Sequence, residues 1–126
     1  MKTAVPLEKY FKASEFNCKC GKCGMGLKDM KPDLLASLVA MREDAGVPFV
    51  ITSAVRCAAH NKAVGGEPDS AHMRGYAVDI TATTSRIRFR ILQAAIRYNI
   101  KRIGIYKTFI HVDVDPTLPS DVCWRG

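Results

Sequence analysis

Histidine is scarce in this sequence, and long apolar runs are missing altogether. The 126 residues include three histidines, so histidine-based chemistry can draw on very few positions. No apolar stretch approaches the roughly 20 residues of a membrane-spanning helix, which excludes a helical span. The sequence also lacks a Pro-, Gly- or Ser-rich linker, an internal repeat and a low-complexity segment. We therefore expect one domain over residues 1–126, with a modest core and a cysteine-rich N-terminal segment at 11–30.

The N-terminus lacks the uninterrupted apolar core of a secretory signal, because charged residues and a proline interrupt residues 1–8. We therefore expect the protein to be made and kept in the cytoplasm unless a separate event releases it. Cytoplasmic retention favours reduced cysteines, whereas release would permit disulfides.

Acidic residues are in the minority: 19 Lys and Arg against 12 Asp and Glu give a formal charge of +7 and a pI near 9.3. Basic surfaces favour polyanions. No nucleic-acid recognition motif accompanies the charge, and the arginines between 86 and 97 are more simply the solvated face of a helix. We expect no specific nucleic-acid partner, and we expect the basic surface to favour an anionic polymer of another kind.

Hydrophobic periodicity predicts two long helices. The first begins at Pro32, where a first helical turn tolerates proline, and ends at Gly46. The second begins with Thr84 or Ser85 as its N-cap. Its inward residues at helical spacing are Ile87, Ile91, Leu92, Ala95 and Ile96.

Shorter elements surround these helices. Residues 49–52 read as a buried strand, 58–64 as a short helix, and 102–106 with 109–114 as a hairpin. Helices combined with short, mostly antiparallel strands predict an α+β fold, with a small sheet flanked by helices.

Two segments far apart in the sequence carry side chains of metal-ligand type, His72 with Asp79 in one and His111 with Asp113 in the other. Both segments alternate apolar and polar residues as strands do. If the strands are neighbours, Asp79, His111 and Asp113 share one face. His72 would then reach in from the preceding loop, and Gly75 would allow the chain to turn.

Two histidines and one carboxylate form a common catalytic zinc set, with a fourth position open for water. Zinc lowers the pKa of that water to about 7 and makes it a usable nucleophile. Each residue taken singly also has an ordinary interpretation, because an aspartate on a strand is usually solvated and a single histidine usually binds no metal.

The five cysteines form a second pattern. Cys18, Cys20 and Cys23 lie in a short, glycine-rich stretch that is similar to a zinc knuckle, while Cys57 and Cys123 lie elsewhere. Three or four thiolates would hold a structural zinc. Reduced thiols or disulfides are the alternatives.

The stretch Ser70-x-His72-x-x-Gly75-x-Ala77-x-Asp79 resembles the first zinc signature of the zinc D-alanyl-D-alanine carboxypeptidase family. That family includes D,D-carboxypeptidases, D,D-dipeptidases and phage L-alanyl-D-glutamate endolysins. Residues 51–66, 104–113 and 11–16 resemble other parts of it. The resemblance implies the fold shared by these peptidases and the hedgehog signalling domain.

The same resemblance assigns roles residue by residue. It implies that His72, Asp79 and His111 hold Zn²⁺. It places Arg56 as a substrate-binding arginine, which suits the bidentate grip of a guanidinium on a carboxylate or carbonyl. Ser70 matches a substrate-contacting serine. A surface salt bridge for Arg56 and a turn role for Ser70 are the alternatives.

The general base is the position where the sequence departs from the family. Several members place a carboxylate three residues before the last zinc histidine, and here that residue is Thr108. We expect Asp113 to be the catalytic residue, or else a carboxylate that orients a histidine or arginine. Glu67 and Asp69 are weaker candidates. His60 either lines the cleft, lies on a helix surface or is a hydrogen-bonded histidine of the core.

These observations predict a monomeric zinc metallopeptidase that hydrolyses peptidoglycan stem peptides, either as a D,D-carboxypeptidase or as an endolysin-type endopeptidase. The absence of a secretory signal suits a phage lysin that reaches the cell wall after the membrane is permeabilised. The alternative is a non-catalytic, zinc-containing wall-binding module on the same scaffold, and Thr108 keeps that alternative open.

Overall fold

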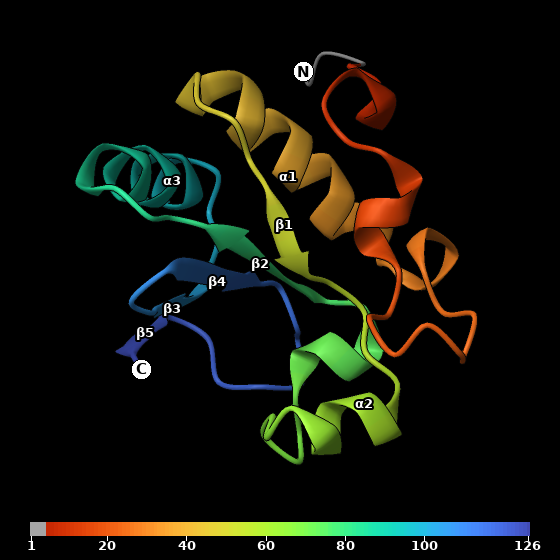
Figure 1. Cartoon of the computed structure of the whole chain (residues 1–126). Helices are drawn as coiled ribbons and strands as arrows, with labels where there is room; N and C mark the ends of the chain where they lie inside the picture. Colours follow the sequence, from red (N-terminus) through yellow and green to blue (C-terminus); the bar gives the residue numbers. More distant parts are fainter. Residues whose placement is uncertain (1–4) are drawn as a thin grey trace.

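A computed structural model describes residues 5–126, and its fold is α+β as predicted (Figure 1). The three α-helices are α1 (Pro32–Ala45), α2 (Ala58–Ala63) and α3 (Ser85–Arg97). The strands are β1 (Ile51–Ser53), β2 (Ala77–Thr81), β3 (Arg102–Ile105), β4 (Phe109–Asp113) and β5 (Val122–Arg125). Short 3₁₀ helices lie at Leu7–Lys9, Ala13–Phe16, Leu27–Asp29 and Ala71–Arg74.

The capping residues predicted from the sequence mark both ends of α1 and the start of α3. Pro32 occupies the first turn of α1, and Gly46 ends that helix in the left-handed conformation with φ +66°. Thr84 caps α3, since its hydroxyl accepts a hydrogen bond from the Ile87 N–H at 3.2 Å. Local chemistry therefore determines where both helices begin or end.

The five strands form one sheet in the order β1-β2-β4-β3-β5. The β1–β2, β2–β4 and β3–β4 pairs are antiparallel, which confirms the predicted hairpin of β3 and β4. Strand β5 pairs parallel to β3, and the sequence patterns did not indicate this strand. The central β2–β4 pair brings the two segments of metal-ligand type side by side.

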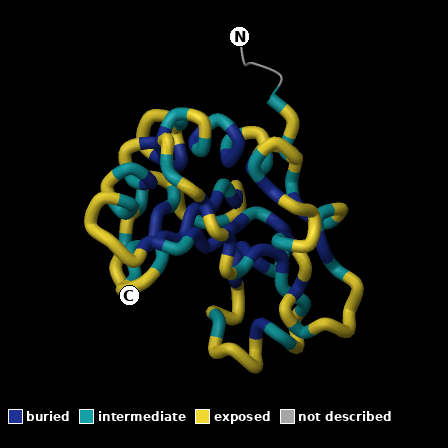
Figure 2. Tube along the Cα trace, turned by 45° about the horizontal axis from the view of Figure 1, so that its top comes forward, coloured by how far each residue is buried: buried dark blue, intermediate teal, exposed yellow. Residues whose placement is uncertain are grey.

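Helices α1 and α3 lie next to each other over one face of the sheet (Figure 1). Val78 and Ile80 of β2 and Ile110 and Val112 of β4 point into the core beneath them. Figure 2 shows the buried residues gathered along these central strands, with exposed loops around them. The opposite sheet face is thereby left for the polar residues of the alternation.

One predicted core position is wrong. Ile96 was expected to point inward, but it is 69% exposed, and Ala94 is fully buried instead. The buried stripe of α3 runs through Ile91, Ala94 and Ala95, which are spaced three and four residues apart. Ile96 follows one residue later, about 100° further around the helix, and so faces away from the core.

Candidate metal centre and surrounding pocket

A single row of residues crosses all five strands on the sheet face opposite α1 and α3. Strand pairing places Ser53 beside Asp79, Asp79 beside His111, His111 beside Gly104, and Gly104 beside Trp124. Because side chains alternate between faces along a strand, the register delivers the whole row to one face. The predicted meeting of Asp79 and His111 is confirmed.

His72 joins this row from the 3₁₀ turn Ala71–Arg74, which precedes β2. The Ser70 hydroxyl caps the turn by accepting a hydrogen bond from the His72 N–H at 3.2 Å. Gly75 ends the turn with φ +77°, and a Cβ there would lie 2.0 Å from the Asp29 carbonyl oxygen. The turn that presents His72 therefore depends on glycine both for its conformation and for its close packing.

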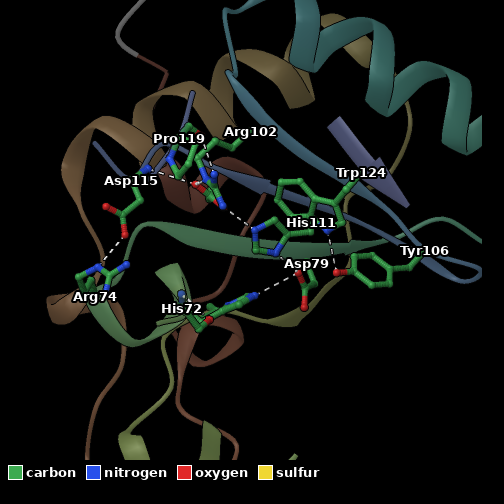
Figure 3. Close-up of polar contacts among 12 residues, drawn as sticks. His72, Arg74, Asp79, Arg102, Tyr106, His111, Asp115, Pro119 and Trp124 are labelled. Atoms are coloured by element: carbon green, nitrogen blue, oxygen red, sulfur yellow. Dashed lines mark hydrogen bonds and ion pairs between the residues drawn. The ribbon is translucent and has the colours of Figure 1, made fainter. Parts of the chain in front are cut away.

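The three predicted ligands converge on one point (Figure 3). His72 Nε2 lies 3.2 Å from Asp79 Oδ1, and His111 Nδ1 lies 2.9 Å from the same oxygen. Zinc bonds of 2.0–2.1 Å in a tetrahedron separate neighbouring ligand atoms by about 3.3 Å. The spacing therefore fits a zinc ion with little adjustment.

The outer nitrogens of the two rings show which atoms face the centre. His72 Nδ1 lies 2.6 Å from the Ala54 carbonyl oxygen, and His111 Nε2 lies 2.6 Å from Asp113 Oδ2. Both partners are acceptors, so these outer nitrogens carry the hydrogens. In neutral rings the inner nitrogens then present lone pairs toward a carboxylate, an arrangement that calls for a cation.

The pKa shifts of Asp79 and His111 reflect the charges of this cluster. Burial raises the pKa of Asp79, but the two imidazoles outweigh burial and hold its pKa well below the ordinary value. Burial lowers the pKa of His111, but Asp113 and Asp79 outweigh burial and raise it above 6.5. The cluster thus favours an ionised carboxylate together with added positive charge, from a proton or from a metal.

Asp113 lies behind His111 with its side chain fully buried. One oxygen faces His111 Nε2, and the other accepts a hydrogen bond from Arg102 Nε at 2.7 Å and one from the Asp115 N–H at 3.2 Å. Both oxygens are engaged away from the inner face of His111. These contacts favour the orienting role among the two interpretations of Asp113.

Arg56 reaches the centre from the loop between β1 and α2. It donates from Nε to Ser53 Oγ at 3.1 Å and from one terminal nitrogen to Asn61 Oδ1 at 3.0 Å. The other terminal nitrogen lies 3.5 Å from Asp79 Oδ2. With its side chain only 14% exposed, Arg56 is no surface salt bridge. It lies beside the oxygen of Asp79 that faces away from the metal position.

The centre opens into a pocket of about 720 Å³. One wall is aromatic, since Tyr106 stacks on Phe109 with centroids 4.5 Å apart, and Trp124 Nε1 donates to the Tyr106 hydroxyl at 2.9 Å. Trp124 lies over Gly104, where a Cβ would come within 2.7 Å of the indole. Glycine at that position allows the aromatic wall to stand beside His111.

The loop before His72 also lines the pocket. Glu67 and Asp69 both line the pocket. In the described part of the chain Asp69 pairs with Arg74 at 2.6 Å, whereas Glu67 has no ion pair. His60 lies on α2 and is not among the lining residues.

An ion pair also joins the two segments that carry the candidate metal ligands. Arg74 Nε lies 2.7 Å from Asp115 Oδ2, which links the turn after His72 to the chain just beyond β4. Burial raises the pKa of Asp115, but Thr117 and Arg74 outweigh burial and hold its pKa below 3.8. Asp115 is therefore held as a carboxylate.

The cysteine-rich segment forms a second cluster, and the fold adds a member to it. Cys57, which lies elsewhere in the sequence, joins Cys18, Cys20 and Cys23, while Cys123 is exposed on β5. Backbone N–H groups of Lys22 and Cys23 lower the pKa of the Cys20 thiol to about 6.

Sequence reasoning did not single out two residues of the site. Arg102 holds Asp113, and Trp124 lies beside His111 with ring centroids 5.3 Å apart. Counting the register of the hairpin outward from its turn would have placed Arg102 opposite Asp113. Strand β5 has four residues, too few to show a periodic hydrophobic pattern, so no local sequence signal pointed to Trp124.

Comparison with protein families agrees with this geometry. The model of the peptidase M15 family matches residues 9–113, most of the chain, and the protein belongs to that family. Peptidases of this family are zinc-dependent, which suits the donors assembled by His72, Asp79 and His111. A comparison with curated proteins gave no match. None of the helices in residues 5–126 is long and apolar enough to cross a membrane.

Proposed function

We propose that the protein hydrolyses peptide bonds in peptidoglycan stem peptides, as a D,D-carboxypeptidase or as an endopeptidase. The observation that carries the proposal is the convergence of His72 Nε2, Asp79 Oδ1 and His111 Nδ1 on one point in a 720 Å³ pocket. A bound zinc ion supplies a Lewis acid there, which lowers the pKa of water and polarises a carbonyl. The surrounding side chains would orient the ligands, transfer the proton and bind the substrate.

Two buried contacts keep the ligands in place. The Ala54 carbonyl fixes the ring of His72, and Asp113 fixes the ring of His111, each at 2.6 Å. Arg102 in turn fixes Asp113. Such partners hold the correct tautomer and orient the ligand for the metal. We therefore assign Asp113 as a positioning residue for His111.

Glu67 is the group we assign to proton transfer. Water adds to the peptide carbonyl carbon, the C–N bond breaks, and the proton lost by water ends on the leaving amine. A carboxylate in the pocket can carry that proton between the two. Glu67 lines the pocket without an ion pair in the described part of the chain, whereas Asp69 is paired with Arg74.

Arg56 and Ser70 are proposed to bind the substrate. Contacts within residues 5–126 engage three of the five N–H groups of Arg56, and the others are available for a carboxylate or carbonyl. Ser70 caps the His72 turn and also lines the pocket. The aromatic wall of Tyr106 and Trp124 would contact the apolar parts of the stem peptide.

A second candidate is a wall-binding module without activity. Thr108 favours it, because a threonine stands where several relatives place the catalytic carboxylate. The two candidates differ in one experiment: purified peptidoglycan is incubated with zinc-loaded protein, and the products are analysed by mass. Release of D-alanine indicates a carboxypeptidase, and paired peptide fragments indicate an endopeptidase. Binding to the wall without any new amine would favour the module.

A further inference from the structure

Three cysteines of the N-terminal segment meet a fourth, Cys57, which directly follows Arg56 in the sequence. The sulfurs of Cys18, Cys20, Cys23 and Cys57 all lie within 4.8 Å of one another. Cys57 Sγ is 3.8 Å from Cys18 Sγ and 3.9 Å from Cys20 Sγ. Zinc–sulfur bonds of about 2.3 Å in a tetrahedron place sulfurs about 3.8 Å apart, so the spacing matches a zinc–thiolate centre.

The backbone around the cluster is arranged for thiolates. Each of the four sulfurs accepts at least one hydrogen bond from a backbone N–H at 3.3–3.4 Å. The donors are the N–H groups of Lys22, Cys23, Met25, Cys57 and His60. Hydrogen bonds donated to sulfur stabilise its charged form, and thiolates are the form that binds metal. A disulfide would need no such donors.

We propose that Cys18, Cys20, Cys23 and Cys57 bind a structural zinc ion that is separate from the His72, Asp79 and His111 site. Four protein ligands complete a tetrahedral shell and leave no position for water or substrate, so this ion has a structural function. Lys19 and Lys22 lie within the same stretch and offset part of the negative charge of four thiolates.

Through Cys57, the proposed ion would link two segments of the chain. Cys18 and Cys57 are 39 residues apart in the chain, so the ion joins the N-terminal segment to the start of α2. Cys57 directly follows Arg56, which contacts Asp79. The ion therefore anchors the loop from which Arg56 reaches into the pocket. This consequence for substrate binding rests on the proposed function, whereas the metal site itself does not.

The test is metal content measured on protein purified under reducing conditions with zinc supplied. We expect two zinc ions per chain in the wild type and one in Cys57→Ser. Serine can replace Cys57 as the N-cap of α2, so this variant removes a thiolate while keeping the cap. His111→Ala should also retain one zinc ion. Cys123→Ser is the matched control, because Cys123 is exposed and lies outside the cluster, and it should retain two.

Cobalt provides a second, spectroscopic readout on the same proteins. With Co²⁺ in place of zinc, wild type and His111→Ala should both show sulfur-to-cobalt charge-transfer absorption, and Cys57→Ser should show less. Loss of the ion should lower the Tm of Cys57→Ser by at least ~10 °C. The proposal is overturned if the wild type holds a single zinc ion that His111→Ala loses. It is equally overturned if the mass of the intact protein reveals disulfides in place of bound metal.

Discussion

Asp79 and His111 lie directly opposite each other on β2 and β4, and His111 Nδ1 lies 2.9 Å from Asp79 Oδ1. This pairing is set by backbone register. A shift of one residue in either strand would turn one of the two side chains into the core. The core residues Val78 and Val112 lie opposite each other in the adjacent pair. Burial of these valines therefore fixes the register that brings the candidate metal ligands together.

Substitution of Asp113 by asparagine tests its positioning role. The amide can still contact His111 but cannot match the charge of the carboxylate, and Arg102 loses its ion-pair partner while keeping its hydrogen bond to the Pro119 carbonyl. We expect zinc affinity to fall by about 10–100-fold, with much of the activity restored at high zinc. Zinc titration followed by competition with a chelator measures this. An unchanged zinc affinity with activity lost at every zinc concentration would instead make Asp113 the proton acceptor.

Glu67→Gln tests the proposed proton carrier. The amide keeps the size of the side chain but cannot accept the proton, so we expect kcat to fall by about 10²–10⁴-fold while zinc content stays unchanged. Asp69→Asn is the matched control on the same loop, and we expect a far smaller change because Asp69 is paired with Arg74. Equal losses in both variants would contradict the assignment.

Arg56→Lys tests substrate binding. Lysine keeps the charge but cannot hold two parallel hydrogen bonds or reach Ser53, Asn61 and Asp79 together. We expect a substantial loss of kcat/KM, mainly through KM, with zinc still bound. Steady-state kinetics on a defined stem peptide measures the split. A variant with wild-type kinetics would show that Arg56 serves the fold alone.

The Arg74–Asp115 pair predicts a specific pH dependence of stability. The pKa of Asp115 is held below 3.8 in the folded protein, so its stabilising effect is present above that pH and is lost as the pH falls through the folded pKa. We expect Asp115→Asn to lower the free energy of unfolding at pH 7 by about 1–3 kcal/mol. Urea denaturation at several pH values should show this difference shrinking below about pH 4. A difference that grows in acid would contradict the account.

The sequence predicted the fold class and the shared sheet face of Asp79 and His111 because local rules govern both. Alternation in two short segments placed Asp79 and His111 on one face, and caps at Thr84 and Gly46 fixed the ends of helices. The prediction that Asp79 and His111 meet required their strands to be neighbours in the sheet. Sequence periodicity alone does not determine which strands pair.

Other features depend on tertiary packing and left little local trace. Cys57 looked isolated because its partners lie some 39 residues earlier. Trp124 belongs to a four-residue strand that pairs parallel with β3. The two interpretations of Asp113 differ only in which atoms surround its carboxylate, and the contact with Arg102 supplies that information.

The most direct test of the central claim is hydrolysis of purified peptidoglycan by wild type and His111→Ala, after chelation and after zinc is restored. We expect chelation to abolish the release of new amines by the wild type, zinc to restore it, and His111→Ala to stay inactive under both conditions. Hydrolysis by the wild type that persists after zinc is removed, or full activity of His111→Ala, would contradict a catalytic zinc centre at His72, Asp79 and His111.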